Sequence, residues 1–561
     1  MNIRNERSPE PLAGRLKLFI RLTKMIRPHK KLLIASVLFS ITGHLSTIGL
    51  TGFAAVAAAV IITDGKFSLP AVIAAVICVI TRGALRYGEH YFGHDIAFRL
   101  LFDIRKKIFE AVNRLAPAKL LDRKTGDICS TVMADVECVE TFFAHTLAPV
   151  IVGIIVPIIM LSVFAAIKPE FALIMLPFYL LMGLFVPVVS FQSSAADGNE
   201  YRNSLSKMNS MLVENLQGLK ELMLFNREEE RLDGILRETG LCNHSYRKIR
   251  SNEGLLAAVV EIIMLAAAAA VIGFGGGFVV SGTADIGDLI TVAVLSITSF
   301  GPLISLIFLS NSLVNTAAAA GRIFALIDEK PVVDDMDELQ GGCITDFRIE
   351  EPPTAESVNF VYPGTGRKIL EDLSLTIKKN RITALKAESG RGKSTVLYLM
   401  MRFFDPTNGR MILNKSDLKK FNLDCLRGGI SYFTQETTLF NISVMDNIRL
   451  ADESATDEEV FKSAEKAGIH HYICSLPSGY NTTAGEQGSR FSSGERQRIG
   501  LARIFLQNNH VILLDEPVSN LDSENEKLIM QNLKNGLEGR TVVLVSHRPS
   551  VIDIADDIIE F

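Results

Sequence analysis

The 561-residue sequence predicts a multidomain protein, in which an all-α transmembrane domain of six helices precedes an α/β domain with a phosphate-binding loop. Two observations carry this prediction. Long apolar runs are concentrated in residues 32–325, although hydrophobic residues make up only 48% of the chain. Residues 382–400 then show an apolar strand, a glycine-containing loop and a helix in succession, which is the context of a phosphate-binding loop.

Cysteine usage and net charge exclude other classes of protein. The seven cysteines are scattered and form no C-x-x-C pair, so we expect neither a disulfide framework nor a zinc site. The net charge of −4 gives no indication of nucleic-acid binding.

Residues 1–31 form a basic N-terminal segment. Nine Lys or Arg residues alternate there with apolar side chains, which predicts either an amphipathic helix at the inner membrane interface or a solvated helix. The positive charge predicts a cytosolic N-terminus. The next apolar run is too long for a cleavable signal peptide.

Six segments reach the roughly 20 residues that a membrane-spanning helix needs. They are residues 32–62, 68–92, 146–168, 170–192, 255–281 and 286–311. The outward connections are very short, whereas the inward connections, 93–145 and 193–254, are long, charged and helix-patterned. We therefore expect helices two to five to continue far into the cytosol. The expected domains are 1–31, the transmembrane domain 32–325, a polar linker 326–349 and the α/β domain 350–561.

The loop at 387–395 predicts a nucleotide site. Its backbone N–H groups, followed by a helix N-terminus, form a site for anions. Lys393 is expected to reach the β- and γ-phosphates, and the Ser394 hydroxyl to help hold Mg²⁺. The predicted ATP-binding residues of this loop are Ser389, Gly390, Gly392, Lys393, Ser394 and Thr395.

A buried strand at 511–514 ends in the paired carboxylates Asp515 and Glu516. Asp515 is the expected Mg²⁺ ligand, and Glu516 the expected general base that activates water. Other motifs accompany this strand in a fixed order. Tyr362 follows an apolar strand, Gln435 follows 430–433 and His547 follows 542–545. Two further stretches are Phe491-Ser492-Ser493-Gly494-Glu495-Arg496-Gln497-Arg498 and Ser519-Asn520-Leu521-Asp522.

Together these motifs resemble the ABC ATPase family over about residues 350–561. The resemblance implies that Tyr362 stacks on adenine, that Gln435 links Mg²⁺ and the attacking water to the membrane domain, and that His547 contacts the γ-phosphate. It implies that Ser492, Gly494 and Glu495 contact ATP held by a second subunit. The short outward and long inward connections resemble those of exporter-type ABC transporters, with coupling turns near 121–127 and 219–227.

Two positions depart from the family pattern. Ala387 replaces the first glycine of the phosphate-binding loop, and Ser493 stands where the signature motif has glycine. An altered signature beside an intact Glu516 and His547 favours a heterodimer with two unequal ATP sites. A homodimer remains open.

Residues 81–99, with an Arg-Tyr-x-Glu and then a His-Asp-x-x-Phe-Arg pattern, resemble the CydC half of the CydDC family. This resemblance implies a bacterial cytoplasmic-membrane heterodimer with a CydD-like partner, which handles cysteine, glutathione or haem. It implies His94 as a ligand of haem b, with His90 on the same helix face and Arg86 available for a propionate. An interfacial histidine with ordinary hydrogen bonds is the alternative for His94.

Three other functions remain open at this point. They are a general exporter of peptides, lipids or drugs, a haem-binding regulator or ATP-gated channel, and a siderophore importer built on the exporter fold. For each of the transporter functions, ATP and Mg²⁺ are the expected cofactors and the lipid bilayer is an expected partner.

Overall fold

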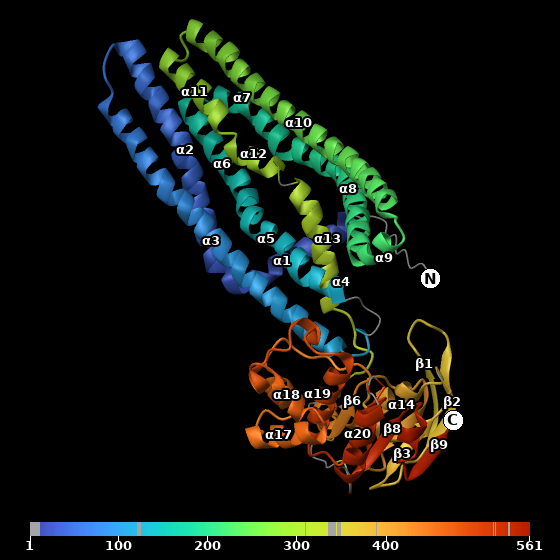
Figure 1. Ribbon diagram of the computed structural model, residues 1–561. Helices are drawn as coiled ribbons and strands as arrows, with labels where there is room; N and C mark the ends of the chain where they lie inside the picture. Colours follow the sequence, from blue (N-terminus) through green and yellow to red (C-terminus); the bar gives the residue numbers. More distant parts are fainter. Residues whose placement is uncertain are drawn as a thin grey trace. The chain divides into compact units, whose positions relative to one another are not determined.

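The computed structural model describes residues 12–120, 125–308, 310–334, 344, 349, 351–388, 390–519, 521, 523–536 and 539–561. The chain divides into two compact units (Figure 1). The helical unit comprises the described parts of residues 1–114 and 123–329, and the ATPase unit those of 115–122 and 330–561. The first predicted coupling turn, 121–127, falls in part on residues 121–124, and the predicted linker falls in part on 335–343 and 345–348. Both stretches lie outside the described residues.

The helical unit contains six helices that are long and apolar enough to cross a membrane, which confirms the predicted transmembrane domain. Its helices are α1 (Leu12–Met25), α2 (Lys30–Asp64), α3 (Leu69–Leu115), α4 (Thr125–Ser130), α5 (Val136–His145), α6 (Leu147–Ile167), α7 (Pro169–Leu180), α8 (Val186–Gln217), α9 (Leu219–Leu224), α10 (Glu228–Val280), α11 (Ile286–Thr298), α12 (Gly301–Phe308) and α13 (Ser310–Ile327). Short π-helical turns at Thr131–Asp135 and Leu181–Phe185 join successive helices.

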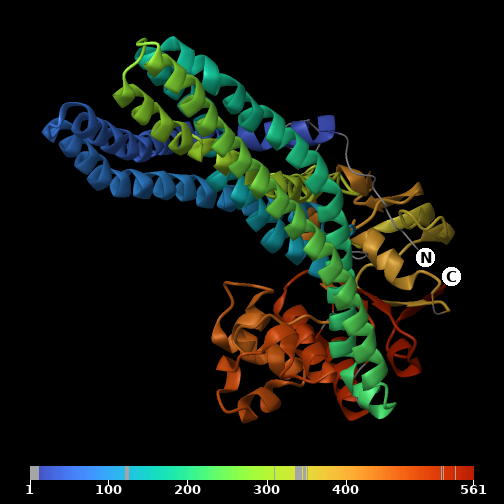
Figure 2. The same cartoon turned by 90° about the horizontal axis from the view of Figure 1, so that it is seen from above.

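Two of these helices are far longer than a bilayer requires. α3 has 47 residues and α10 has 53, whereas about 20 residues cross the hydrocarbon core. Both therefore continue beyond the membrane, as the sequence predicts. α10 runs beside α8 in both views of the helical unit (Figures 1 and 2).

The core of the helical unit is aromatic and aliphatic. Phe164, Phe171 and Phe300 are fully buried there. Tyr179 donates a hydrogen bond of 2.6 Å from its hydroxyl to Ser299 Oγ, so its polar group is satisfied between the helices. Large apolar side chains on α3 remain exposed instead, for example Ile80 and Phe102, as expected for a helix that faces lipid or a second subunit.

The basic N-terminal helix α1 packs on the helical unit. Leu22 is buried, and Phe19 stacks on Phe142 of α5 with ring centroids 5.3 Å apart. Arg21 lies over the ring of Phe324 and makes a two-pronged ion pair with Asp328. This ion pair holds the pKa of Asp328 below its usual value. α1 is therefore not a fully solvated helix.

The ATPase unit contains two sheets. Its strands are β1 (Thr354–Val361), β2 (Lys368–Leu375), β3 (Ile382–Lys386), β4 (Asn408–Leu413), β5 (Ser416–Asp417), β6 (Ile430–Phe433), β7 (Val511–Asp515), β8 (Thr541–Val545) and β9 (Asp557–Glu560). Its helices are α14 (Lys393–Met400), α15 (Leu423–Gly428), α16 (Val444–Arg449), α17 (Asp457–Lys466), α18 (His470–Ser475), α19 (Ser493–Leu506), α20 (Ser523–Gly536) and α21 (Pro549–Ile552).

The larger sheet is parallel, with strand order β6-β7-β8-β3-β9. Its central strands are buried on both faces, because Ile512 and Leu514 join one core cluster while Val511 and Leu513 join the other. The smaller antiparallel sheet has the order β2-β1-β4-β5. In the parallel sheet the carboxyl ends of β6, β7, β8 and β3 meet at one edge, which is where ligands bind in open α/β sheets.

Candidate ATP site and a polar pocket in the helical unit

The phosphate-binding loop connects β3 to α14. Gly390 and Gly392 have φ values of +80° and +92°, which side chains rarely allow. A Cβ at Gly392 would also lie 2.8 Å from the Ile369 side chain, so this position requires glycine. Ala387 is not among the residues with positive φ, so its methyl group causes no backbone strain. Ser389 lies outside the described residues.

Lys393 is the first residue of α14 and points back into this loop. Its Nζ donates hydrogen bonds to the carbonyl oxygens of Ala387 (2.7 Å) and Glu388 (3.1 Å). Burial lowers the pKa of the Lys393 amine, while the nearby Asp515 and Glu516 oppose that shift. The loop therefore holds a cation where phosphate groups would bind. Thr395, two residues further along the helix, shares a 2.9 Å hydrogen bond with the Tyr362 hydroxyl.

Asp515 ends β7 and carries a carboxylate suited to a cation. It is 1% exposed, and its Oδ1 has no hydrogen-bond partner among the described residues. Burial raises the pKa of Asp515, and a hydrogen bond with Ser394 opposes this rise. An orphaned buried carboxylate oxygen beside a hydroxyl fits Mg²⁺, which takes one or two carboxylates together with phosphate oxygens.

Glu516 occupies the centre of the candidate site. Its Oε1 lies 2.9 Å from His547 Nε2, and its Oε2 accepts a 3.3 Å hydrogen bond from Gln435 Nε2. These three residues follow β7, β8 and β6, which are neighbours in the sheet. Glu516 also has a φ of +49°, a left-handed conformation that costs about 1–3 kcal/mol and is typical of functional sites.

The signature motif lies at the start of α19. Ser492 is the N-cap residue, and it forms a reciprocal capping box with Glu495. Ser493 is the first residue of the helix, and Gly494 follows it within the first turn. The cap places successive backbone N–H groups at an exposed helix N-terminus. Phosphate groups bind well at such a terminus, because its N–H groups lack partners within the helix.

The structure thus brings together most of the predicted hydrolysis residues, while the signature residues interact among themselves at a separate helix end. It also gives a contact to a residue of the signature motif for which the sequence predicted no separate role. Gln497, one turn after Ser493, donates a 2.9 Å hydrogen bond to the Glu516 carbonyl oxygen.

The helical unit holds a polar pocket of about 180 Å³. It is lined from α2, α3, α5, α6 and α12 by Ser36, His44, Arg86, Glu89, His90, Ala144, His145, Ala148, Pro149, Val152, Pro302 and Ser305. Two residues expected at a ligand site, Arg86 and His90, therefore line it. His94 is not among its lining residues. Instead, His94 packs against His145, with ring centroids 5.1 Å apart, and its Nδ1 lies 3.6 Å from Glu140 Oε1.

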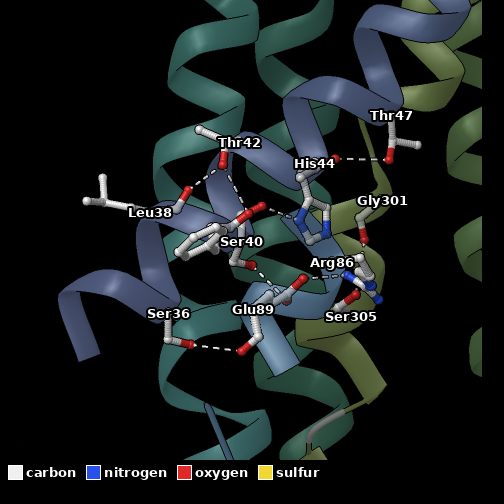
Figure 3. A network of polar contacts seen from close by, with 12 residues as sticks. Ser36, Leu38, Ser40, Thr42, His44, Thr47, Arg86, Glu89, Gly301 and Ser305 are labelled. Atoms are coloured by element: carbon white, nitrogen blue, oxygen red, sulfur yellow. Dashed lines mark hydrogen bonds and ion pairs between the residues drawn. The ribbon is translucent and has the colours of Figure 1, made fainter. Parts of the chain in front are cut away.

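A hydrogen-bond chain crosses one wall of this pocket (Figure 3). Arg86 Nη1 lies 2.9 Å from Glu89 Oε2, and Ser40 Oγ donates a 2.8 Å hydrogen bond to Glu89 Oε1. His44 Nδ1 lies 2.9 Å from the Ser40 carbonyl oxygen, which can only accept. His44 therefore carries a proton on Nδ1, and its Nε2 is the proton-accepting nitrogen in the neutral ring.

The pocket does not fit haem. Its volume is below the roughly 300–1,000 Å³ of sites that enclose larger organic ligands.

Comparison with known proteins identifies the family. The family model described as ABC transporter transmembrane region matches residues 32–303, and the model described as ABC transporter matches residues 370–519. A probable ABC transporter ATP-binding/permease protein of Haemophilus influenzae is 36% identical over 96% of this chain and 97% of its own length. The chain therefore belongs to the ABC transporter family. It is a multi-pass membrane protein and an ATP-hydrolysing transporter of the exporter type.

Other relatives carry names that indicate different functions. A putative multidrug export protein of Bacillus subtilis is 29% identical over 89% of this chain and 85% of its own length. An ATP-dependent lipid A-core flippase of Syntrophus aciditrophicus is 28% identical over 97% of this chain and 90% of its own length. The fold matches that of a bacterial Atm1-family ABC exporter with ATP bound, with a TM-score of 0.81, 22% identity, and coverage of 95% and 93% of the two chains.

Proposed function

We propose that this chain is one half of a heterodimeric ABC exporter of the bacterial cytoplasmic membrane, with CydC-like specificity for small thiols such as cysteine or glutathione. Haem is the second cargo that the resemblance at residues 81–99 implies, and the pocket volume supports a small thiol better. The basic N-terminal segment supports cytosolic termini, because positive charge is retained on the cytoplasmic side. A second ABC half-transporter completes the assembly.

The arrangement around Glu516 supports hydrolysis at the carboxyl edge of the parallel sheet. Glu516 accepts a proton from the attacking water, while His547 and Gln435 hold its two carboxylate oxygens in place. Lys393 and the loop N–H groups stabilise charge on the phosphates. Asp515 and Ser394 would hold Mg²⁺, which would supply positive charge to offset the negative charge of the phosphate groups. Tyr362 provides an aromatic surface for adenine.

The polar pocket is the observation that carries the cargo class. Ionisable residues within membrane helices are costly, so they mark functional sites by default. Here Arg86 and Glu89 place opposite charges within 2.9 Å of each other. A small zwitterion such as cysteine matches this pair, because its carboxylate complements Arg86 and its ammonium group complements Glu89.

Cysteine-stimulated ATP hydrolysis in proteoliposomes tests the cargo. We expect cysteine to raise the hydrolysis rate of the wild-type dimer, and R86Q to abolish this stimulation while basal hydrolysis stays within about twofold. R82Q is the matched control, because Arg82 lies one turn earlier on α3 and does not line the pocket. Stimulation by haem with R86Q unaffected would overturn the thiol assignment.

A general lipid or drug exporter is the second candidate, favoured by the names of two relatives. Stimulation by apolar amphiphiles, with no response to cysteine, would identify it.

The signature serine supports unequal ATP sites. Ser493 adds a side chain where the motif approaches phosphate, whereas Ala387 is unstrained. We therefore place the weaker site at this chain's signature motif and the stronger site at its own Glu516. The test is purification of the chain alone. A stable homodimer with full activity would contradict the heterodimer, and inactive protein that a CydD-like partner reactivates would support it.

A further inference from the structure

Gln497 is a buried amide that connects the signature helix to the residue that follows the β7 strand. It lies in α19, four residues after Ser493 and therefore on the same helix face, and it is 2% exposed. Its Nε2 donates to the Glu516 carbonyl oxygen at 2.9 Å and to Ser519 Oγ at 3.2 Å. One side chain thus contacts both Glu516 and the turn after it.

The backbone of Glu516 depends on such contacts. Its φ of +49° is a conformation that a glutamate rarely adopts, so surrounding groups must hold it. Its N–H donates to the Val545 carbonyl oxygen of β8 at 2.9 Å. Its carbonyl oxygen accepts one hydrogen bond from the Ser519 N–H at 3.3 Å and a shorter one from Gln497 Nε2 at 2.9 Å. The β8 strand therefore anchors one side of Glu516, and the signature helix anchors the other.

The link reaches the signature motif through a rigid element. α19 is a continuous 14-residue helix, and the capping box between Ser492 and Glu495 fixes its first turn. Further along, Ile499, Leu501 and Ile504 are buried in the core of the unit. α19 therefore moves as one rigid helix, so that a displacement of its first turn displaces Gln497 by a similar amount.

We propose that Gln497 is a positioning residue that couples the signature motif of one ATP site to the general base of the other. This inference rests on the proposed roles of Glu516 and of the signature motif. When the signature contacts ATP held by the partner subunit, Gln497 holds the Glu516 backbone so that its carboxylate faces the attacking water. The two ATP sites thereby communicate through one side chain of this chain.

The variant Q497M tests the proposal on the full-length dimer in lipid. Methionine keeps the length and helix propensity of the side chain but removes the donor. We expect kcat for ATP hydrolysis to fall about tenfold or more, while KM and ATP affinity change less than about twofold. Q507M, at the other end of the same helix, is the matched control. A purely structural role would instead lower ATP affinity and thermal stability together with kcat, and that result, or an unchanged kcat, would overturn the proposal.

Coupling to the signature motif has its own readout. The variants S492A and Q497M are expected to be non-additive, so that the double variant is no slower than the more impaired single variant. If the fold-losses of kcat in the two single variants instead multiply in the double variant, the proposed coupling is wrong. If Q497M does not fold, S519A replaces it, because this change removes the second contact of the Gln497 amide and is expected to lower kcat two- to fivefold. An unchanged kcat in S519A would then overturn the proposal. If wild-type protein hydrolyses ATP but E516Q is unimpaired, the proposed role of Glu516 fails instead.

Discussion

His547 Nε2 lies 2.9 Å from Glu516 Oε1, although the two residues are separated by a complete helix and a strand. The pairing of β7 with β8 brings them together, because parallel neighbours place their carboxyl ends side by side. The histidine is 47% exposed and the glutamate 19%. The pair therefore faces the open edge of the sheet, where a nucleotide can enter.

Replacing the carboxylate of Glu516 is expected to stop hydrolysis but not binding. E516Q keeps the size of the side chain and removes the base, so kcat should fall about 10²–10⁴-fold. ATP affinity, measured by equilibrium binding, should stay near the wild-type value. E453Q, at an exposed loop position, is the control and should leave kcat unchanged. A wild-type rate in E516Q would exclude it as the base.

Removal of the metal should abolish turnover. We expect chelation by EDTA to stop hydrolysis and added Mg²⁺ to restore it, with D515N requiring much more Mg²⁺. Burial raises the pKa of Asp515, so its carboxyl is protonated at a higher pH than an ordinary aspartate. Protonation blocks cation binding, and the Mg²⁺ concentration for half-maximal rate should therefore rise as the pH falls. Turnover in EDTA would contradict the Mg²⁺ assignment.

The aromatic ring of Tyr362 should matter more than its hydroxyl. The ring is held edge-on against Phe360 and Phe404, with centroids 4.9 Å and 5.3 Å away. Loss of one aromatic contact of about 0.5–1.5 kcal/mol predicts a KM for ATP raised about 2- to 13-fold in Y362A. Y362F should stay within about twofold, because it keeps the ring and loses the hydrogen bond between the hydroxyl and Thr395. An equal rise of the KM for ATP in Y362A and Y362F, measured by steady-state kinetics, would argue against stacking of the ring on adenine.

The alanine of the phosphate-binding loop should be nearly neutral. Ala387 has no positive φ, so A387G relieves no strain. We expect kcat/KM for ATP to change less than about twofold. G392A is the contrasting variant and should lose ATP binding, because the added Cβ would meet Ile369 and Leu370 at 2.8 Å. A marked gain in A387G would show that this loop limits the site.

Local sequence determined much of this protein. The apolar runs specified the spanning helices, since about 20 apolar residues are stable across a bilayer only as a helix. The loop before α14 and the carboxylates after β7 could be predicted from the sequence, because each motif lies within a few residues of the strand that precedes it. The family followed from these motifs, and the exporter architecture followed from the short outward and long inward connections between the apolar segments.

The tertiary structure decided what contiguous sequence does not encode. Strand order placed Gln435, Glu516 and His547 at one sheet edge, and helix packing joined α2 and α3 with α5, α6 and α12 around the Arg86 pocket. It separated His94 from that pocket, and it brought Gln497 to the Glu516 carbonyl. Such contacts depend on the pairing of distant elements, which burial of apolar surface sets and local residue patterns do not specify.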